Sequence, residues 1–238
     1  MVWETSDVRS LRGHGLGSLG WSSGDKDLAF VTEGMLDGTL IATAEGWRRV
    51  EQISPGDRVL TFDGGPQTVI AVQSAIVEAG WSGWPRAHWP LVVPDDALGN
   101  RGPLRLLPGQ PVLLESDLAE DMFGDPFALI PAAALEGWRG IAPAPPMHQE
   151  TVRLLILPVD EVVYVAGHML LYCPADNATG LPGFGAAGDR GAARAGYAPL
   201  SLASAREFVA CLIAEDVGAA LRGAAPDGSQ AALRALSP

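Results

Sequence analysis

Cysteine is scarce in this chain of 238 residues, which has only Cys173 and Cys211. They lie far apart and form no C-x-x-C motif, so a disulfide scaffold and a zinc knuckle are excluded. A bridge between them remains an alternative. Because an unpaired cysteine in a globular chain usually packs as a small hydrophobe, we expect two buried free thiols.

Basic residues are also few. The chain has 16 Lys and Arg against 28 Asp and Glu, a net charge of −12, and the basic residues are scattered. Since binding to nucleic-acid phosphates requires clustered Lys and Arg, the composition argues against a nucleic-acid partner. Hydrophobic residues make up 47% and charged residues 18% of the chain, which indicates a soluble globular protein rather than a disordered one.

Long hydrophobic runs are absent as well. No stretch approaches the roughly 18 uninterrupted apolar residues of a transmembrane helix, so we expect no membrane span. The first 30 residues contain charges such as Asp7, Arg9 and Lys26 and resemble no conventional signal peptide. We therefore expect a cytoplasmic protein, with secretion that uses no cleaved signal as the alternative.

Common catalytic and metal-binding motifs are missing too. The histidines form no H-E-x-x-H and no pair four residues apart, and no G-x-S-x-G occurs. Acidic pairs stand at Asp95–Asp96 and Glu120–Asp121, where we expect solvated loop residues rather than metal ligands. We predict no metal and no cofactor. The histidines are His14, His88, His148 and His168.

The most informative segment is residues 38–63. Leu40, Ile41 and Thr43 favour a strand, and Glu45–Gly46 supplies a tight turn. An apolar face returns at Val50 and Ile53, and a Pro-Gly-Asp turn precedes a further strand. Thr68–Val72 adds another predicted strand. The pattern therefore predicts a mostly β protein.

The same segment resembles the opening block of Hint domains, the self-processing β-fold of hedgehog proteins and inteins. That block has the form G-T-x-I-x-T-x-x-G-x-x-x-V-E-x-(L/I)-x-x-G-D-x-V-x-T-x-D, and every fixed position of it is matched between Gly38 and Asp63. The resemblance implies a Hint-like β-fold. It also implies three reactive positions: a nucleophile, a histidine that destabilises the scissile amide, and a later acid or base.

None of these reactive positions holds the residue that the family uses. The nucleophile, usually cysteine, belongs four residues before the Gly-Thr pair, where this chain has Gly34. The histidine block L-x-x-S-P-x-H-x-V-L-L aligns with residues 104–114, which places Gln110 at the histidine. In the third block, Leu154 and Asp160 replace two histidines. An amide can form hydrogen bonds but cannot exchange protons near neutral pH.

The pattern suggests a scaffold kept without its reactive groups, so we assign no catalytic residue. The chain is interpreted as an inactive Hint-like domain that serves as a structural or protein-binding module. One alternative is an autoprocessing enzyme that uses Thr39, Ser54 or Thr61 as its nucleophile. The other is a ligand-binding module that uses the tryptophans of residues 81–89, within a Trp- and Pro-rich crossing over residues 80–103.

The remaining segments complete the predicted organisation. We expect an N-terminal arm over 1–30, the Hint-like domain over 31–176, a Gly/Ala-rich linker over 177–200 and a C-terminal helix with a tail over 201–238. The helix is amphipathic, starts near Ser201 or Ser204 and ends at Gly223.

Several local predictions lie within the Hint-like domain. Residues 104–114 form two short strands around a Pro-Gly turn, and residues 125–135 one or two helical turns, where Hint relatives hold a strand and a turn. Residues 142–146 form a loop, and 152–156 and 161–166 the last clear strands.

We expect the apolar residues of the predicted C-terminal helix to share one face: Leu202, Phe208, Val209, Leu212, Ile213, Val217 and Leu221.

Overall fold

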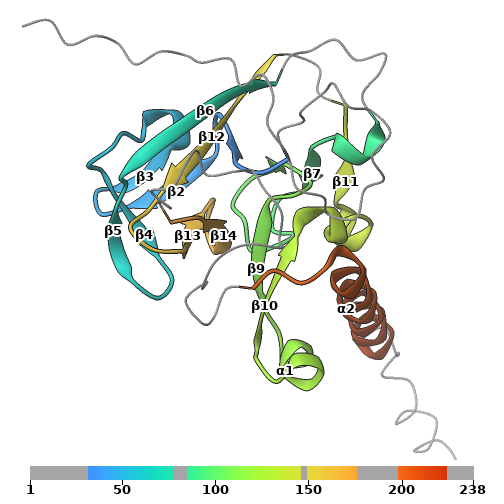
Figure 1. The fold of residues 1–238 in the computed structure, drawn as a ribbon. Coiled ribbons are helices and arrows are strands. Elements are labelled where there is room, and N and C mark those ends of the chain that lie inside the picture. Colours follow the sequence, from blue (N-terminus) through green and yellow to red (C-terminus); the bar gives the residue numbers. More distant parts are fainter. Residues whose placement is uncertain (1–31, 78–84, 146–148, 176–197, 224–238) are drawn as a thin grey trace, which may run out of the picture.

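The computed structural model describes residues 32–77, 85–145, 149–175 and 198–223. Antiparallel strands dominate these residues, so the predicted mostly β class is confirmed (Figure 1). The predictions on residues 1–30 and on the linker up to residue 197 lie outside the described part.

The strands are β1 (Met35–Leu36), β2 (Leu40–Thr43), β3 (Gly46–Arg49), β4 (Arg58–Thr61), β5 (Gly65–Thr68), β6 (Ala71–Val77), β7 (Leu91–Val93), β8 (Leu104–Leu106), β9 (Pro111–Glu115), β10 (Phe127–Pro131), β11 (Ala142–Pro143), β12 (Glu150–Ile156), β13 (Glu161–Val165) and β14 (Met169–Cys173). The helices are α1 (Asp117–Phe123) and α2 (Leu202–Gly223), with short 3-10 helices η1 (Val50–Gln52), η2 (Arg86–His88), η3 (Ala132–Leu135) and η4 (Trp138–Gly140).

The strands form two sheets. One has the order β11-β7-β8-β1-β12-β6, and the other has the order β10-β9-β14-β13-β2-β4-β5 with β3 paired to β2. The predicted strand over Thr68–Val72 is wrong as a single element, because the chain passes from one sheet to the other there. Val69 exchanges backbone hydrogen bonds with the Gly56–Asp57 turn, whereas the Ile70 amide donates to Ile156 on β12.

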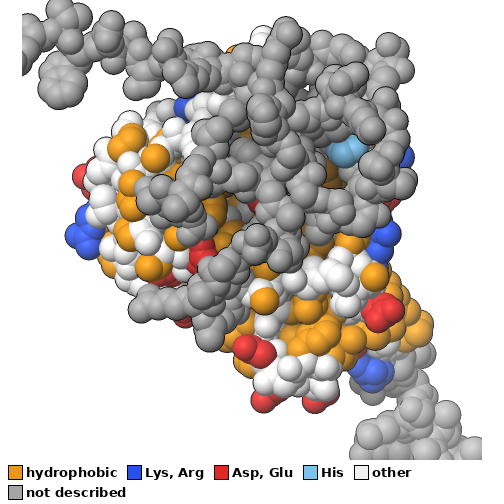
Figure 2. All heavy atoms as spheres, viewed as in Figure 1, with side chains coloured by type: hydrophobic (Ala, Val, Ile, Leu, Met, Phe, Trp, Pro, Cys, Tyr) orange, Lys and Arg blue, Asp and Glu red, His pale blue; other side chains and the backbone are white. Residues whose placement is uncertain are grey.

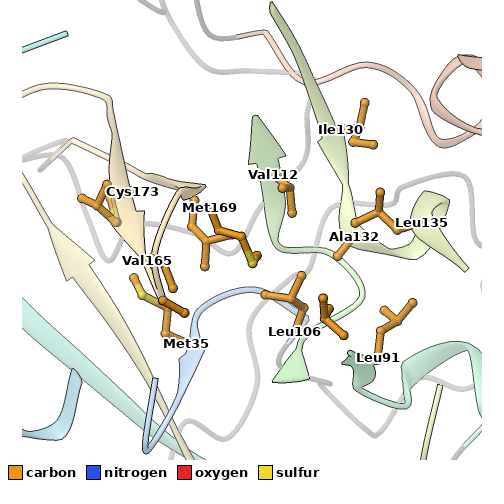
Figure 3. Packing of buried hydrophobic residues seen from close by; sticks show 14 of the residues in the cluster. Met35, Leu91, Leu106, Val112, Ile130, Ala132, Leu135, Val165, Met169 and Cys173 are labelled. Carbon is orange, nitrogen blue, oxygen red and sulfur yellow. The ribbon is translucent and has the colours of Figure 1, made fainter. Parts of the chain in front are cut away.

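The hydrophobic core lies between the sheets (Figure 3). Met35 and Leu106 contribute to it from the first sheet, and Val112, Val165 and Met169 contribute from the second. Each of these side chains is at most 2% exposed. Burying an apolar side chain of this size contributes roughly 1.5–3 kcal/mol, so this interface holds β1 firmly in place.

The segment between β9 and η3 differs from its prediction. Residues 127–131 are strand β10, which pairs along its whole length with β9, and only 132–135 form a helical turn. Helix α1 was not predicted, although its caps are readable: the Ser116 side chain accepts from the Leu118 amide, and Gly124 ends the helix at φ +76°. Glu120–Asp121 therefore lies on a helix, whereas Asp95–Asp96 lies in a turn as expected.

Two further strands correct the sequence analysis. Ala142–Pro143, expected in a loop, is β11 and pairs with β7, which itself lies in the Trp- and Pro-rich crossing. Residues 161–165 are not the last strand, because β14 follows and pairs with both β13 and β9. All residues of β14 are apolar, so it lacks the alternation that marks a half-exposed strand.

Helix α2 packs against η3, β10 and α1. The Ser201 hydroxyl accepts from the Ser204 amide at 3.1 Å, which confirms Ser201 as the cap. Phe208 is buried, but Val217 and Leu221 are 53% and 69% exposed. The prediction that all the apolar residues of the helix share one face is therefore wrong. Val217 lies nine residues from Phe208, about two and a half turns, and therefore on the opposite side of the helix.

The two cysteines are both free. Cys173 is buried in β14, as expected, whereas Cys211 lies on the exposed side of α2. The prediction of two buried thiols is therefore correct for Cys173 only.

Candidate functional site

The position that the Hint resemblance assigns to the nucleophile is buried in the middle of the first sheet. Gly34 directly precedes β1, which lies between β8 and β12. Its backbone has φ +112°, a conformation that residues with a side chain rarely adopt. The Gly34 amide donates a hydrogen bond of 2.8 Å to Oε1 of Gln110.

Gln110 comes from the turn between β8 and β9 and is 1% exposed. Its Nε2 donates to the carbonyls of Tyr172 and Pro111 at 3.0 and 3.2 Å. These two acceptors fix the orientation of the amide, so that Oε1 points to Gly34. The fold thus brings together the positions that the resemblance assigns to the nucleophile and the histidine. The Gln110 amide oxygen accepts a hydrogen bond there, but a glutamine side chain cannot deliver a proton.

The chain upstream of Gly34 is held by the same turn. The Gly109 amide donates to the Thr32 carbonyl at 2.8 Å. A Cβ on Gly109 would lie 2.9 Å from that carbonyl oxygen, so only glycine allows this close approach. The backbone on both sides of the Glu33–Gly34 peptide bond is therefore anchored to adjacent residues of the β8–β9 turn.

The space that a nucleophilic side chain would need is filled. A Cβ added to Gly34 would lie 2.6 Å from Cγ1 of Val152 and 3.1 Å from the Arg153 carbonyl oxygen. Val152 is 2% exposed and opposes Leu36 in the β1–β12 pairing. The sequence analysis missed Val152, because only the pairing of these distant segments places it against Gly34.

The other two positions of the resemblance have ordinary structural surroundings. Leu154 is 6% exposed in β12 and offers only aliphatic carbon. Asp160 lies before β13, and its Oδ1 accepts from the Ala175 amide at 2.8 Å. This bond connects the β12–β13 turn to the chain after β14.

The alternative nucleophiles are engaged in turns. The Thr39 hydroxyl donates to the Leu36 carbonyl at 2.6 Å, and the Thr61 hydroxyl donates to the Gly65 carbonyl at 2.8 Å. Ser54 is exposed, and its amide donates to Asp57 within the Pro-Gly-Asp turn. The two threonine hydroxyls therefore donate to backbone carbonyls rather than to an imidazole or carboxylate base.

The two described histidines lie on other segments than Gly34 and Gln110. His168 is exposed after β13, and His88 lies in η2, where burial lowers the pKa of its imidazole. His14, His148, Trp81 and Trp84 fall outside the described part, which leaves the Trp-rich hypothesis with only the half-buried Trp89. Within the described ranges, no three His, Cys, Asp or Glu side chains are arranged to hold a metal ion.

The family model of the Hint domain matches residues 34–170, more than half of the chain. The chain belongs to the Hint domain family. The match begins at Gly34, and it confirms the Hint-like β-fold that the sequence predicts. None of the helices in the described residues is both long and apolar enough to cross a membrane.

Solved structures with a similar fold include the bacterial intein-like domain from Clostridium thermocellum, with 14% identity and a TM-score of 0.44 over 60% of this chain and 99% of that chain. A splice-inactive variant of the AceL NrdHF class 3 split intein has 14% identity and a TM-score of 0.40, over 60% and 97% of the two chains. The MchDnaB-1 intein has 13% identity and a TM-score of 0.35, over 57% and 98%. No curated protein matches the sequence.

Proposed function

We propose that this Hint domain does not process itself and acts as a structural or protein-binding module. The observation that carries the proposal is the nucleophile position. Gly34 has no side chain, its φ of +112° disfavours one, and Val152 fills the volume where a side chain would start. Formation of a (thio)ester needs a side-chain nucleophile that is positioned against the preceding carbonyl.

The surroundings of the Glu33–Gly34 bond suit an anchor rather than a cleavage site. Gln110 holds the Gly34 amide, and Gly109 holds the Thr32 carbonyl one residue upstream. Because Gln110 also uses both amide hydrogens on backbone carbonyls, it serves as a buried link between β1, β9 and β14. In this function, the position where other family members carry the nucleophile anchors Thr32 and Gly34 to the β8–β9 turn.

The charge of the surface favours a protein over a nucleic acid as partner. The chain carries a net charge of −12. On the face in Figure 2 the basic side chains lie in separate places, and carboxylates lie beside hydrophobic surface at the α1 end. Since phosphate backbones are bound by clustered Lys and Arg, such a surface suits contact with another protein.

Trapping with hydroxylamine tests the proposal. Hydroxylamine and thiols cleave a (thio)ester, so an autoprocessing chain would release its upstream segment, and the C-terminal residue 33 of that segment would carry a hydroxamate or a thioester. We expect the full chain to keep its mass in both reagents. A cleavage product would overturn the proposal, and the variants Thr39→Val, Ser54→Ala and Thr61→Val would then show which hydroxyl attacks.

A further inference from the structure

Edge strands expose unpaired backbone groups, and most edges in the described residues are protected. Strand β3 has two arginines among its four residues, β5 contains a proline, and β11 is two residues long. The edge of β10 is occupied, because the Leu200 amide donates to the Leu129 carbonyl at 2.8 Å.

Strand β6 differs from all of these edges. It has seven residues, Ala-Val-Gln-Ser-Ala-Ile-Val, without charge, proline or glycine. It pairs along its whole length with β12, and within the described residues no strand pairs with its other side (Figure 1). A long, uncharged edge of this kind is a template for pairing with another strand.

The register shows which residues of β6 face the open side. On the other side of β12, the Asp37 amide donates to the Thr151 carbonyl, so Thr151 and Arg153 direct their backbone bonds to β1. Backbone groups alternate along a strand, so Val152 and Leu154 bond to β6 instead, opposite Ala75 and Gln73. The three β6 residues between these bonded positions therefore present their N–H and C=O groups outward: Val72, Ser74 and Ile76.

We propose that β6 pairs antiparallel with β6 of a second copy of this chain, about a two-fold axis at Ser74. Such a pairing places Ser74 opposite the partner's Ser74 and Val72 opposite the partner's Ile76. All of these residues have outward backbone groups, so each pair exchanges two main-chain hydrogen bonds. The two six-stranded sheets then become one continuous sheet across the dimer.

The strand is suited to its own copy in pattern and charge. A two-fold interface must be self-complementary, and β6 has a β-branched residue on each side of Ser74 at equal spacing. Ile76 is 47% exposed and lies on the same face as the half-buried Val72, so the pairing buries Ile76 against the partner's Val72. Strand β6 itself carries no charge. The Arg153 guanidinium of β12, which donates to the Ser74 hydroxyl at 3.4 Å, forms an ion pair with Asp37, so the positive charge beside the two-fold axis is balanced.

Sedimentation velocity over a range of concentrations tests the pairing on the full chain. We expect a monomer–dimer equilibrium that Ile76→Lys shifts to monomer, because the new lysines would oppose apolar residues. Leu221→Lys, a matched change of an exposed apolar residue on α2, leaves the dimer intact. A chain that is monomeric at every concentration, or a dimer that Ile76→Lys does not change, overturns the proposal.

Cysteine cross-linking gives a second readout that does not depend on a destabilising charge. Opposed residues of a hydrogen-bonded pair have Cα atoms about 5.5 Å apart, within the range of a disulfide. With Cys211→Ser as background, oxidation of Ser74→Cys yields a covalent dimer, and Thr68→Cys on the exposed edge of β5 does not. Equal cross-linking of both variants, or none at Ser74→Cys, contradicts the two-fold pairing.

Discussion

A Cβ atom added to Gly34 would lie 2.6 Å from Cγ1 of Val152. Gly46, the first residue of β3, has the same φ of +112° but no atom within 4 Å of an added Cβ. The two glycines therefore share a backbone requirement and differ in available space. Comparing substitutions at the two glycines therefore measures the destabilisation that results from the lack of space beside Gly34.

Gly34→Ala is expected to destabilise the domain more than Gly46→Ala. Both variants place a side chain at a positive φ, which costs about 1–3 kcal/mol. Gly34→Ala also forces overlap with Val152, and overpacking of this kind costs about 1–3 kcal/mol more. Urea denaturation of both variants measures the difference, and equal losses would contradict the closed position.

Combining Gly34→Ala with Val152→Ala tests the same contact from the other side. Val152→Ala alone should destabilise by removing buried methyl groups. If Val152 fills the space beside Gly34, the double variant loses less than the sum of the single losses, by about 0.5–3 kcal/mol. Additive losses would mean that the two residues do not compete for space.

Gln110→Leu is expected to reduce the free energy of unfolding substantially. The change removes the acceptor for the Gly34 amide and the donors to Tyr172 and Pro111 at a site that is 1% exposed. A buried polar group that loses its partner costs about 1–3 kcal/mol. Gln67→Leu is the control, because its amide bonds Gly64 at an exposed position, where losses stay within about 0.5 kcal/mol. Similar losses for both variants would argue against the buried link.

Acid should weaken the attachment of α2. Asp216 accepts hydrogen bonds from the Arg139 guanidinium at 2.9 and 3.1 Å and from the Trp138 indole at 2.9 Å, and these bonds lower the pKa of its carboxyl. The stabilisation is fully present above the unfolded pKa, about 4, and is lost as pH falls through the lower folded pKa. Thermal melts between neutral and strongly acidic pH follow this loss.

The matched comparison for this acid effect is Asp216→Asn against Asp121→Asn, which removes one carboxylate from exposed α1. Asp216→Asn should reduce the decrease in melting temperature that occurs below about pH 4. The rest of the decline should persist, because Asp57 has a lowered pKa through bonds to the Ser54 amide and Arg48. An unchanged profile in Asp216→Asn would show that the α2 contact is not linked to pH.

The two thiols should differ strongly in reactivity. Burial raises the pKa of Cys173 to about 12, whereas Cys211 is exposed on α2. Because the thiolate is the reactive form, iodoacetamide at mildly alkaline pH should modify Cys211 alone in the native chain. Both thiols should react in denaturant, and Cys211→Ser should abolish the native reaction. Rapid native labelling of Cys173 would contradict its burial.

The sequence predicted the part of the fold that local rules control. Strands β2 and β4 follow from β-branched residues and from turns at Gly46 and Gly56, both of which have positive φ. The apolar face expected at Val50 and Ile53 is wrong as part of a strand, because Val50–Gln52 forms η1 and the strand between the turns, β3, ends at Arg49. Strand β14 was missed because it is buried on both sides and therefore shows no alternation. Helix α1 was missed although Ser116 and Gly124 are typical caps, since its seven residues give too short a period to recognise.

The candidate site was predicted in part for a similar reason. Fixed spacing within each block identified Gly34 and Gln110, and the fold places them in contact. Val152 was not identified, because its contact with Gly34 depends on the pairing of β1 with β12, which no local pattern records. Likewise, the separation of Val217 from the buried face of α2 depends on where the helix packs.

The central claim is that the peptide bond between Glu33 and Gly34 stays intact. Intact mass spectrometry of the full chain, after prolonged incubation with dithiothreitol, tests it most directly. A single species at the mass of the whole chain, 24.9 kDa, is predicted. A pair of fragments with a new terminus at residue 34, or anywhere between residues 30 and 40, would contradict the account.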